Sequence, residues 1–294
     1  MTTLPAPRAV AELLRLPAVL TVPGDSLLGA AAAGTRREAP HTVGLALSSS
    51  LLYLAGMALN DYADREVDAL ERPHRPIPSG MVEPRFALRL AQALTAAGIV
   101  MARLAGGSRA LRVAGPLAGA VWSYDLVLKG TPAGPPAMAT CRSLDVLLGA
   151  GTLRPALVPA ALVGGHTLAV TAVSRHETTG GAPRTARVAA VAAAGVTLAA
   201  AGFAARRLAG RHTGSVVPVT AALVAYATSF GGAAVAAARE PTPERLQRTV
   251  GAGVLGLIPL ESALVAGARR PGSAAVLASL WPIARRLAKK RSVT

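Results

Sequence analysis

Acidic residues in this sequence concentrate in one short stretch, residues 60–68, which reads NDYADREVD directly after a long apolar run. Asp61, Asp64 and Asp68 are spaced i, i+3 and i+7, so a helix that continues through them carries all three carboxylates on one face. Hard oxygen ligands suit Mg²⁺, which binds one or two protein carboxylates and completes its shell with substrate phosphates. The alternative is a solvated helix end, which is disfavoured because acids at a helix C-terminus oppose the macrodipole. The spacing therefore predicts a magnesium site.

The overall composition indicates that the elements around this site lie in a membrane. Of the 294 residues, 52% are hydrophobic, 16% are charged and 3% are aromatic, and the mean hydropathy is +0.43. The chain is too apolar for an ordinary soluble enzyme of this length. Its apolar residues gather in blocks of about twenty, separated by short segments of Arg, Pro and Gly, as transmembrane helices do. We therefore expect an all-α, multi-pass bundle in the cell membrane.

Nine of the apolar blocks predict membrane spans, and a short tenth block follows them. The blocks cover residues 10–33, 42–59, 85–104, 111–128, 136–153, 155–173, 188–205, 216–238, 250–268 and 273–283. One transmembrane helical domain over residues 1–294 accommodates them, with polar active-site loops at residues 60–84 and 174–187. The N-terminal residues lack a signal-peptide cleavage pattern, so we expect the first block to remain as an anchor.

The charge of the chain points to anionic partners other than nucleic acid. There are 31 Lys and Arg against 15 Asp and Glu, a net charge of +16, but the cations lie in loops between apolar blocks. Anionic lipid headgroups and an anionic substrate are the expected partners of such loops. A cytoplasmic N-terminus would place both polar loops in the cytoplasm, although Arg206 and Arg207 then break the positive-inside rule. Cys141 stands alone, which excludes an internal disulfide and a cysteine-built metal site.

The sequence after the acids extends the motif. Arg72 is followed by RPIPSG at residues 75–80, and together with N-D-x-x-D-x-x-x-D after the second apolar block this resembles the first signature of the UbiA superfamily of intramembrane prenyltransferases. The resemblance implies an enzyme that uses Mg²⁺ to move an isoprenoid group from a prenyl diphosphate to an acceptor, whose identity the sequence leaves open. Residues 124–129, YDLVLK, are similar to the family segment in which a lysine, here Lys129, meets the diphosphate.

Other parts of the chain also resemble this family. The stretch R-x-x-D-x-x-L-G that begins at Arg142 is most similar to the EboC-like branch, and it adds Arg142 to the candidate substrate-binding residues. The family's second signature, D-x-x-x-D after the sixth helix, reads SRHET here, so only Glu177 remains acidic. The resemblance makes Glu177 a candidate metal ligand and substrate contact, with Arg175 beside it as a further substrate contact. The alternative is a surface ion pair between Glu177 and Arg175.

Prenyl transfer suits the residue types in these motifs. Ionisation of a prenyl diphosphate requires stabilisation of the charge that develops on the leaving group, and Mg²⁺ held by the three acids would act as a Lewis acid. The candidate donor contacts are Asn60, Arg72, Arg75 and Lys129, the arginines as bidentate forks and the lysine as a point charge. For the two arginines, positive-inside anchoring is the alternative.

Two other functions remain open from the sequence alone. Acids beside membrane spans often mark ion pathways, so an ion-coupled transporter is one alternative, although the acidic motif has no inverted repeat. The weakened second signature leaves room for a family member that binds prenyl diphosphate or lipid with little catalysis.

Overall fold

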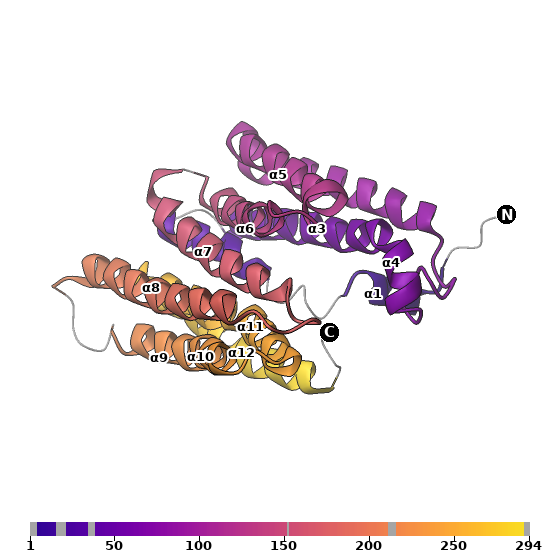
Figure 1. Ribbon diagram of the computed structural model, residues 1–294. Coiled ribbons are helices and arrows are strands. Elements are labelled where there is room, and N and C mark those ends of the chain that lie inside the picture. Colours follow the sequence, from indigo (N-terminus) through magenta and orange to yellow (C-terminus); the bar gives the residue numbers. More distant parts are fainter. Residues whose placement is uncertain (1–4, 16–21, 35–38, 152, 211–215, 291–294) are drawn as a thin grey trace.

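The computed structural model describes residues 5–15, 22–34, 39–151, 153–210 and 216–290. Within these ranges every regular element is a helix, which confirms the all-helical prediction (Figure 1). The first half contains α1 Pro7–Leu13, α2 Pro23–Ala33, α3 Ala39–Ala63, α4 Arg65–Glu71, α5 Pro84–Ser123, η2 Tyr124–Leu128 and α6 Gly134–Ala150. The second half contains η3 Arg154–Ala156, α7 Leu157–Ser174, α8 Pro183–Leu208, α9 Val217–Tyr226, η5 Ala227–Gly231, α10 Gly232–Arg239, α11 Pro243–Gly267 and α12 Pro271–Lys290.

Six stretches of the described chain are long and apolar enough to cross a membrane, consistent with a multi-pass membrane protein. They are residues 40–63, 84–128, 154–174, 183–208, 217–239 and 243–267. The predicted nine spans are therefore not confirmed. α6 has 17 residues, at the short end for a span, and the block predicted over residues 10–33 contains the short helices α1 and α2. Residues 16–21 of that block lie outside the described ranges.

The stretch 84–128 turns back on itself. Gly107 has φ 65° and ψ −156°, a backbone conformation that only glycine adopts without strain. On the far side of it, Trp122 Nε1 donates a hydrogen bond to Thr95 Oγ1 at 3.1 Å. A straight helix would separate these two residues by about 40 Å, so the two arms of α5 lie antiparallel. They correspond to the blocks predicted at residues 85–104 and 111–128.

Helix packing divides the bundle into two parts. α3 packs chiefly against the arms of α5, whereas α11 packs among α7, α8, α9 and α12 (Figure 1). The second half of α11 is buried along its whole length, from Leu257 to Gly267. Such all-round burial explains why its sequence is apolar on every side except at Glu261 and Ser262, where a helix at a bundle surface would have a polar face.

The loop after α4 is fixed by its apolar residues. Ile77 and Val82 are buried against Ala58 and Leu59 of α3. Gly80 has φ 76°, which allows the tight turn between the two buried side chains. The RPIPSG segment therefore folds back onto the end of α3 and brings its arginines to the acids.

Candidate active site

A cavity of about 620 Å³ lies where the C-terminal end of α3 meets η2 and the end of α7. Six residues singled out from the sequence line it: Asn60, Asp64, Arg72, Arg75, Lys129 and Glu177. Four others, Asp61, Asp68, Arg142 and Arg175, are not part of its lining. Arg15, Tyr124 and Asp125 also line it, and the sequence analysis did not assign them a role.

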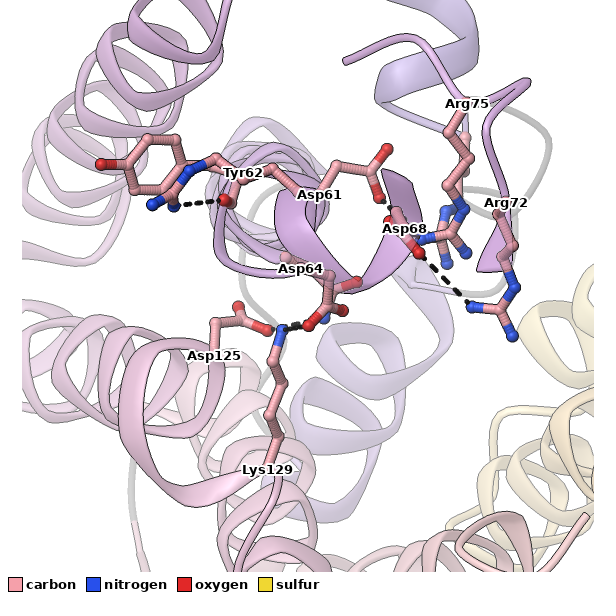
Figure 2. Close-up of polar contacts among 11 residues, drawn as sticks. Asp61, Tyr62, Asp64, Asp68, Arg72, Arg75, Asp125 and Lys129 are labelled. Atoms are coloured by element: carbon pink, nitrogen blue, oxygen red, sulfur yellow. Dashed lines mark hydrogen bonds and ion pairs between the residues drawn. The ribbon is translucent and has the colours of Figure 1, made fainter. Parts of the chain in front are cut away.

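Two of the three motif acids are held by arginines that line the cavity. Asp61 Oδ1 lies 2.9 Å from Arg15 Nη2 and 3.6 Å from Arg75 Nη1. Arg75 Nη1 also donates a short hydrogen bond to Asp68 Oδ2, and Arg72 Nη1 lies 3.8 Å from the other oxygen of that carboxylate (Figure 2). The side chains of Asp61 and Asp68 are 4% and 2% exposed. Arg75 thus joins two buried carboxylates, and the metal role predicted for all three acids stays a prediction.

Asp64 differs from its neighbours because it faces the cavity. It lies at the junction of α3 and α4, and its side chain is 30% exposed. Lys129 Nζ lies 2.6 Å from Asp64 Oδ1 in an ion pair (Figure 2). Both side chains are partly exposed, at 20% and 30%, so another anion in the cavity can compete with Asp64 for the ammonium group.

Asn60 and Asp125 form a second pair on the same wall. Asn60 Nδ2 donates to Asp125 Oδ1 at 3.1 Å, which orients the amide oxygen away from Asp125. Asp125 lies in η2, one turn before Lys129. This spacing within the YDLVLK segment was the signal that could have identified Asp125 as a cavity residue. Asn60, Asp64 and Asp125 together supply hard oxygen atoms to one wall of the cavity.

The loop after α7 contributes Glu177. This side chain is half-buried, and its Oε2 has no hydrogen-bond partner. Burial raises the pKa of Glu177, and the positive charge of Arg72 opposes that rise. The alternative of a Glu177–Arg175 ion pair is not what forms, because Arg175 Nη1 instead donates to the carbonyl oxygens of Thr131 and Lys129. Arg175 therefore fastens the Lys129 loop to the end of α7.

Arg142, the remaining candidate, lies on α6 in an ion pair with Asp25 at 2.8 Å. The structure does not bring it to the cavity, so its predicted role in substrate binding has no geometric support.

The oxygen atoms on the cavity wall fit Mg²⁺ by their chemistry, but they do not form a complete protein cage. Within the described ranges no three His, Cys, Asp or Glu side chains are grouped as metal ligands. Mg²⁺ needs only one or two protein carboxylates when substrate phosphates supply its other ligands. Asp64 and Asp125 can provide them, with the Asn60 amide oxygen beside them and Glu177 also in the lining.

Sequence comparisons give a consistent family assignment. A family model described as the UbiA prenyltransferase family matches residues 25–252. The digeranylgeranylglyceryl phosphate synthase of Methanothrix thermoacetophila is 43% identical over 94 residues, which are 32% of this chain and 35% of that protein. The synthase of the same name from Halobacterium salinarum is 35% identical over 173 residues, 57% of this chain and 59% of that protein. The chain thus spans between about a third and three fifths of the length of these relatives.

Solved structures show the same fold. A structure of digeranylgeranylglyceryl phosphate synthase in membranes has a TM-score of 0.66 and 17% identity, and the match covers 89% of this chain and 98% of that one. A UbiA homologue from Archaeoglobus fulgidus bound to GPP and Mg²⁺ has a TM-score of 0.61 and 15% identity, covering 87% of this chain and 99% of that one.

Proposed function

Because the chain belongs to the UbiA prenyltransferase family, we propose that it is a membrane-embedded enzyme that moves an isoprenoid group from a prenyl diphosphate to an acceptor. The observation that carries the proposal is the cavity, which combines oxygen ligands with partly exposed positive charge. A diphosphate with bound Mg²⁺ needs both, and the surrounding apolar helices can accommodate the isoprenoid chain. The A. fulgidus homologue bound to GPP and Mg²⁺ makes geranyl diphosphate the first donor to test.

In the proposed reaction the bond between C1 of the prenyl group and the diphosphate oxygen breaks. Its electrons leave with the diphosphate, a nucleophilic atom of the acceptor bonds to C1, and the acceptor then loses a proton. Lys129 and Arg72 contact the diphosphate oxygens, where they stabilise the developing negative charge. Asp64, Asp125 and Asn60 would hold Mg²⁺, which when bound supplies Lewis-acid stabilisation of the leaving group.

Asp61 and Asp68 have a different part in this proposal from the one that their spacing predicted. Because each is buried against arginine, they hold Arg15 and Arg75 at the cavity edge instead of binding metal directly. Arg75 uses Nη1 for both acids, so the rest of its guanidinium remains as a fork toward the donor.

Glu177 is the proposed acid on the side of the second, altered signature. Its Oε2 lacks a partner, and a second Mg²⁺ or a protonated acceptor would satisfy it. With one carboxylate where the family signature has two, this side would bind metal more weakly, since each lost anion removes Coulomb attraction.

The acceptor and the orientation are finer proposals. The printed name of the curated relatives, digeranylgeranylglyceryl phosphate synthase, makes a glyceryl phosphate lipid the first acceptor to test. The positive-inside rule would place the N-terminal segment, with Arg8 and Arg15, in the cytoplasm. Because Arg15 lines the cavity, the cavity end of the bundle would face the cytoplasm too. The cavity acids lie at a helix end and not at mid-span, so they do not favour the transporter alternative.

The decisive experiment is pyrophosphate release by purified protein in lipid nanodiscs, with geranyl diphosphate, a glyceryl phosphate lipid and graded Mg²⁺. We expect release that depends on donor and Mg²⁺ and that requires a higher Mg²⁺ concentration in Asp64→Asn. Glu66→Gln is the matched control, because Glu66 is an exposed carboxylate on α4 that pairs with Arg65 at the surface. Tight donor binding without release would indicate a binding protein. The absence of both donor binding and release would refute the proposal.

A further inference from the structure

A second polar cluster lies inside the bundle, where α2, α6 and α11 meet. Asp25, Asp145 and Glu261 are 0%, 6% and 1% exposed, and none of them lines the cavity. Arg142 is the cation among them, with Nη1 2.8 Å from Asp25 Oδ2 and Nη2 4.0 Å from Glu261 Oε1. Ser49 of α3 donates to Asp145 Oδ2 at 2.7 Å. The proposed transferase reaction makes no use of these residues.

The charges of this cluster do not balance if every acid is ionised. Three carboxylates and one guanidinium leave two negative charges in an apolar interior, where unpaired charge is costly. The other titratable groups that interact with the cluster are Tyr53 of α3, Cys141 of α6 and His166 of α7. His166 is held between the Tyr226 hydroxyl and the Gly253 carbonyl, so its ring is already occupied. None of these groups supplies the missing positive charge.

The contacts between the acids show what replaces that charge. The Asp25 carboxyl lies within hydrogen-bonding reach of the carboxyl groups of both Asp145 and Glu261. Two ionised carboxylates repel at that separation, and the contact becomes attractive only if one member holds a proton. Asp25 Oδ1, Asp145 Oδ1 and Glu261 Oε1 also receive no hydrogen bond from any N–H or hydroxyl donor in the described chain. Protons on the acids themselves account for both observations.

A metal ion would be the other way to neutralise the cluster. Within the described ranges, however, these side chains are not grouped as metal ligands. Arg142 also approaches both Asp25 and Glu261, and a bound cation would compete with its guanidinium. The arrangement therefore favours protons.

We propose that this cluster is a proton-binding site with two resident protons, one on Asp145 and one on Glu261, both donated to an ionised Asp25 that pairs with Arg142. The cluster is then neutral, and every proton joins two helices. Asp145 links α6 to α2, and Glu261 links α11 to α2. Polar contacts of this kind hold membrane helices together where the hydrophobic effect does not.

The backbone around the cluster is shaped for this contact. A Cβ atom at Gly24 would lie 1.8 Å from Glu261 Oε2, and one at Gly149 would lie 2.1 Å from the Ser26 carbonyl oxygen. The absence of these two side chains lets α2 approach α11 and α6 closely enough for carboxyl groups to share protons. The site thus positions α6, which follows the Lys129 loop, without touching the donor.

Amide substitution tests the assignment of charge, because Asn and Gln match the protonated acids in shape and can donate the same hydrogen bond. Asp145→Asn and Glu261→Gln, singly and together, should change the melting temperature by less than about 3 °C, since no buried charge is gained or lost. Asp25→Asn removes the proposed ionised acid and leaves Arg142 unpaired, so it should lower the melting temperature by roughly 6–20 °C. Arg142→Gln should do the same, and the Asp25→Asn, Arg142→Gln double variant should recover most of the loss.

Two further measurements complete the test. Infrared spectra at neutral pH should show the carbonyl stretch of protonated carboxyl groups, reduced in the Asp145→Asn, Glu261→Gln double variant. The proposal is overturned if that band is the same in both proteins, or if the two amide variants destabilise as much as Asp25→Asn. It is also overturned if Na⁺, K⁺ or Mg²⁺ raises the melting temperature of the wild-type protein but not of the double variant, because the cluster would then bind a metal cation.

Discussion

The three motif acids should separate into two classes when each is changed to asparagine. Asp64 has a 30% exposed side chain on the cavity wall, whereas Asp61 is 4% exposed and paired with two arginines. Asp64→Asn should therefore impair the use of Mg²⁺, and Asp61→Asn should chiefly impair stability. The i, i+3, i+7 spacing alone predicts the opposite, a shared metal role for both.

The expected magnitudes follow from the contacts. Asp61→Asn loses a charge-assisted hydrogen bond to Arg15, worth about 1.5–3 kcal/mol, so the melting temperature should fall by roughly 3–12 °C. Asp64→Asn loses a partly exposed ion pair worth about 1 kcal/mol or less, a shift of at most about 4 °C. Its Mg²⁺ half-saturation for pyrophosphate release should rise at least about tenfold, because one of the few anionic ligands is gone.

Thermal unfolding in detergent and Mg²⁺ titration of pyrophosphate release measure the two effects on the same preparations. Asp68→Asn should behave like Asp61→Asn, since Arg75 holds both carboxylates. The reasoning is refuted if Asp61→Asn raises the Mg²⁺ requirement as much as Asp64→Asn while its melting temperature is unchanged. Asp61 would then be a metal ligand, as the spacing predicts.

Three other predictions concern the cations, the altered signature and the orientation. Arg75→Lys keeps the charge but loses the bidentate guanidinium, so donor affinity should fall about tenfold or more. Lys289→Ala on α12 should leave donor affinity unchanged. Equal losses of affinity in the two variants would indicate generic membrane electrostatics. Burial raises the pKa of Glu177, so the wild-type protein loses stability as pH rises from the ordinary carboxyl pKa through the raised one. Glu177→Gln should therefore raise the melting temperature at neutral but not at acid pH, and should increase the Mg²⁺ requirement for turnover; no effect on either would remove Glu177 from the site. The lone natural cysteine is buried, so it should not react with a membrane-impermeant maleimide. The reagent should label Ser79→Cys and Ser108→Cys from opposite faces of oriented vesicles. Labelling of both variants from the same face would contradict a membrane-spanning hairpin in α5.

Helix formation and the position of the acidic motif could be predicted because both depend on local sequence. The apolar blocks predicted an all-helical protein. The motif at residues 60–80 predicted an active site at the end of the second apolar block, which is α3. The Gly-Gly-Ser-Arg segment at residues 106–109 also marked the turn between the two arms of α5, which were predicted as separate blocks. The number of spans could not be read in the same way, because hydropathy does not show that the block at residues 10–33 contains the short helices α1 and α2 or that α6 has only 17 residues.

Long-range pairing was the other limit. The arginine that holds Asp61 lies 46 residues away in sequence, and nothing in the local pattern joins them. The spacing of the acids indicated a common face, but it contained no information on whether cations would occupy that face. Asp125 lies one turn before Lys129, but the family resemblance assigned a role in this segment only to the lysine.

The wide helical turn at η2 makes one wall of the cavity tolerant of a change in chain length. Lys129 N donates to Tyr124 O at 2.9 Å, a bond that spans five residues where an α-helix spans four. Such a turn contains one residue more than a regular α-helical turn, so removing that residue would restore regular helix geometry and keep the orientation of the residues after it. Leu126 and Val127 are 49% and 67% exposed, so the shortening would disturb little packing. A deletion of one residue in η2 should therefore leave the Lys129 ammonium group facing Asp64, whereas a deletion in a regular α-helical stretch would rotate the residues after it by about 100°.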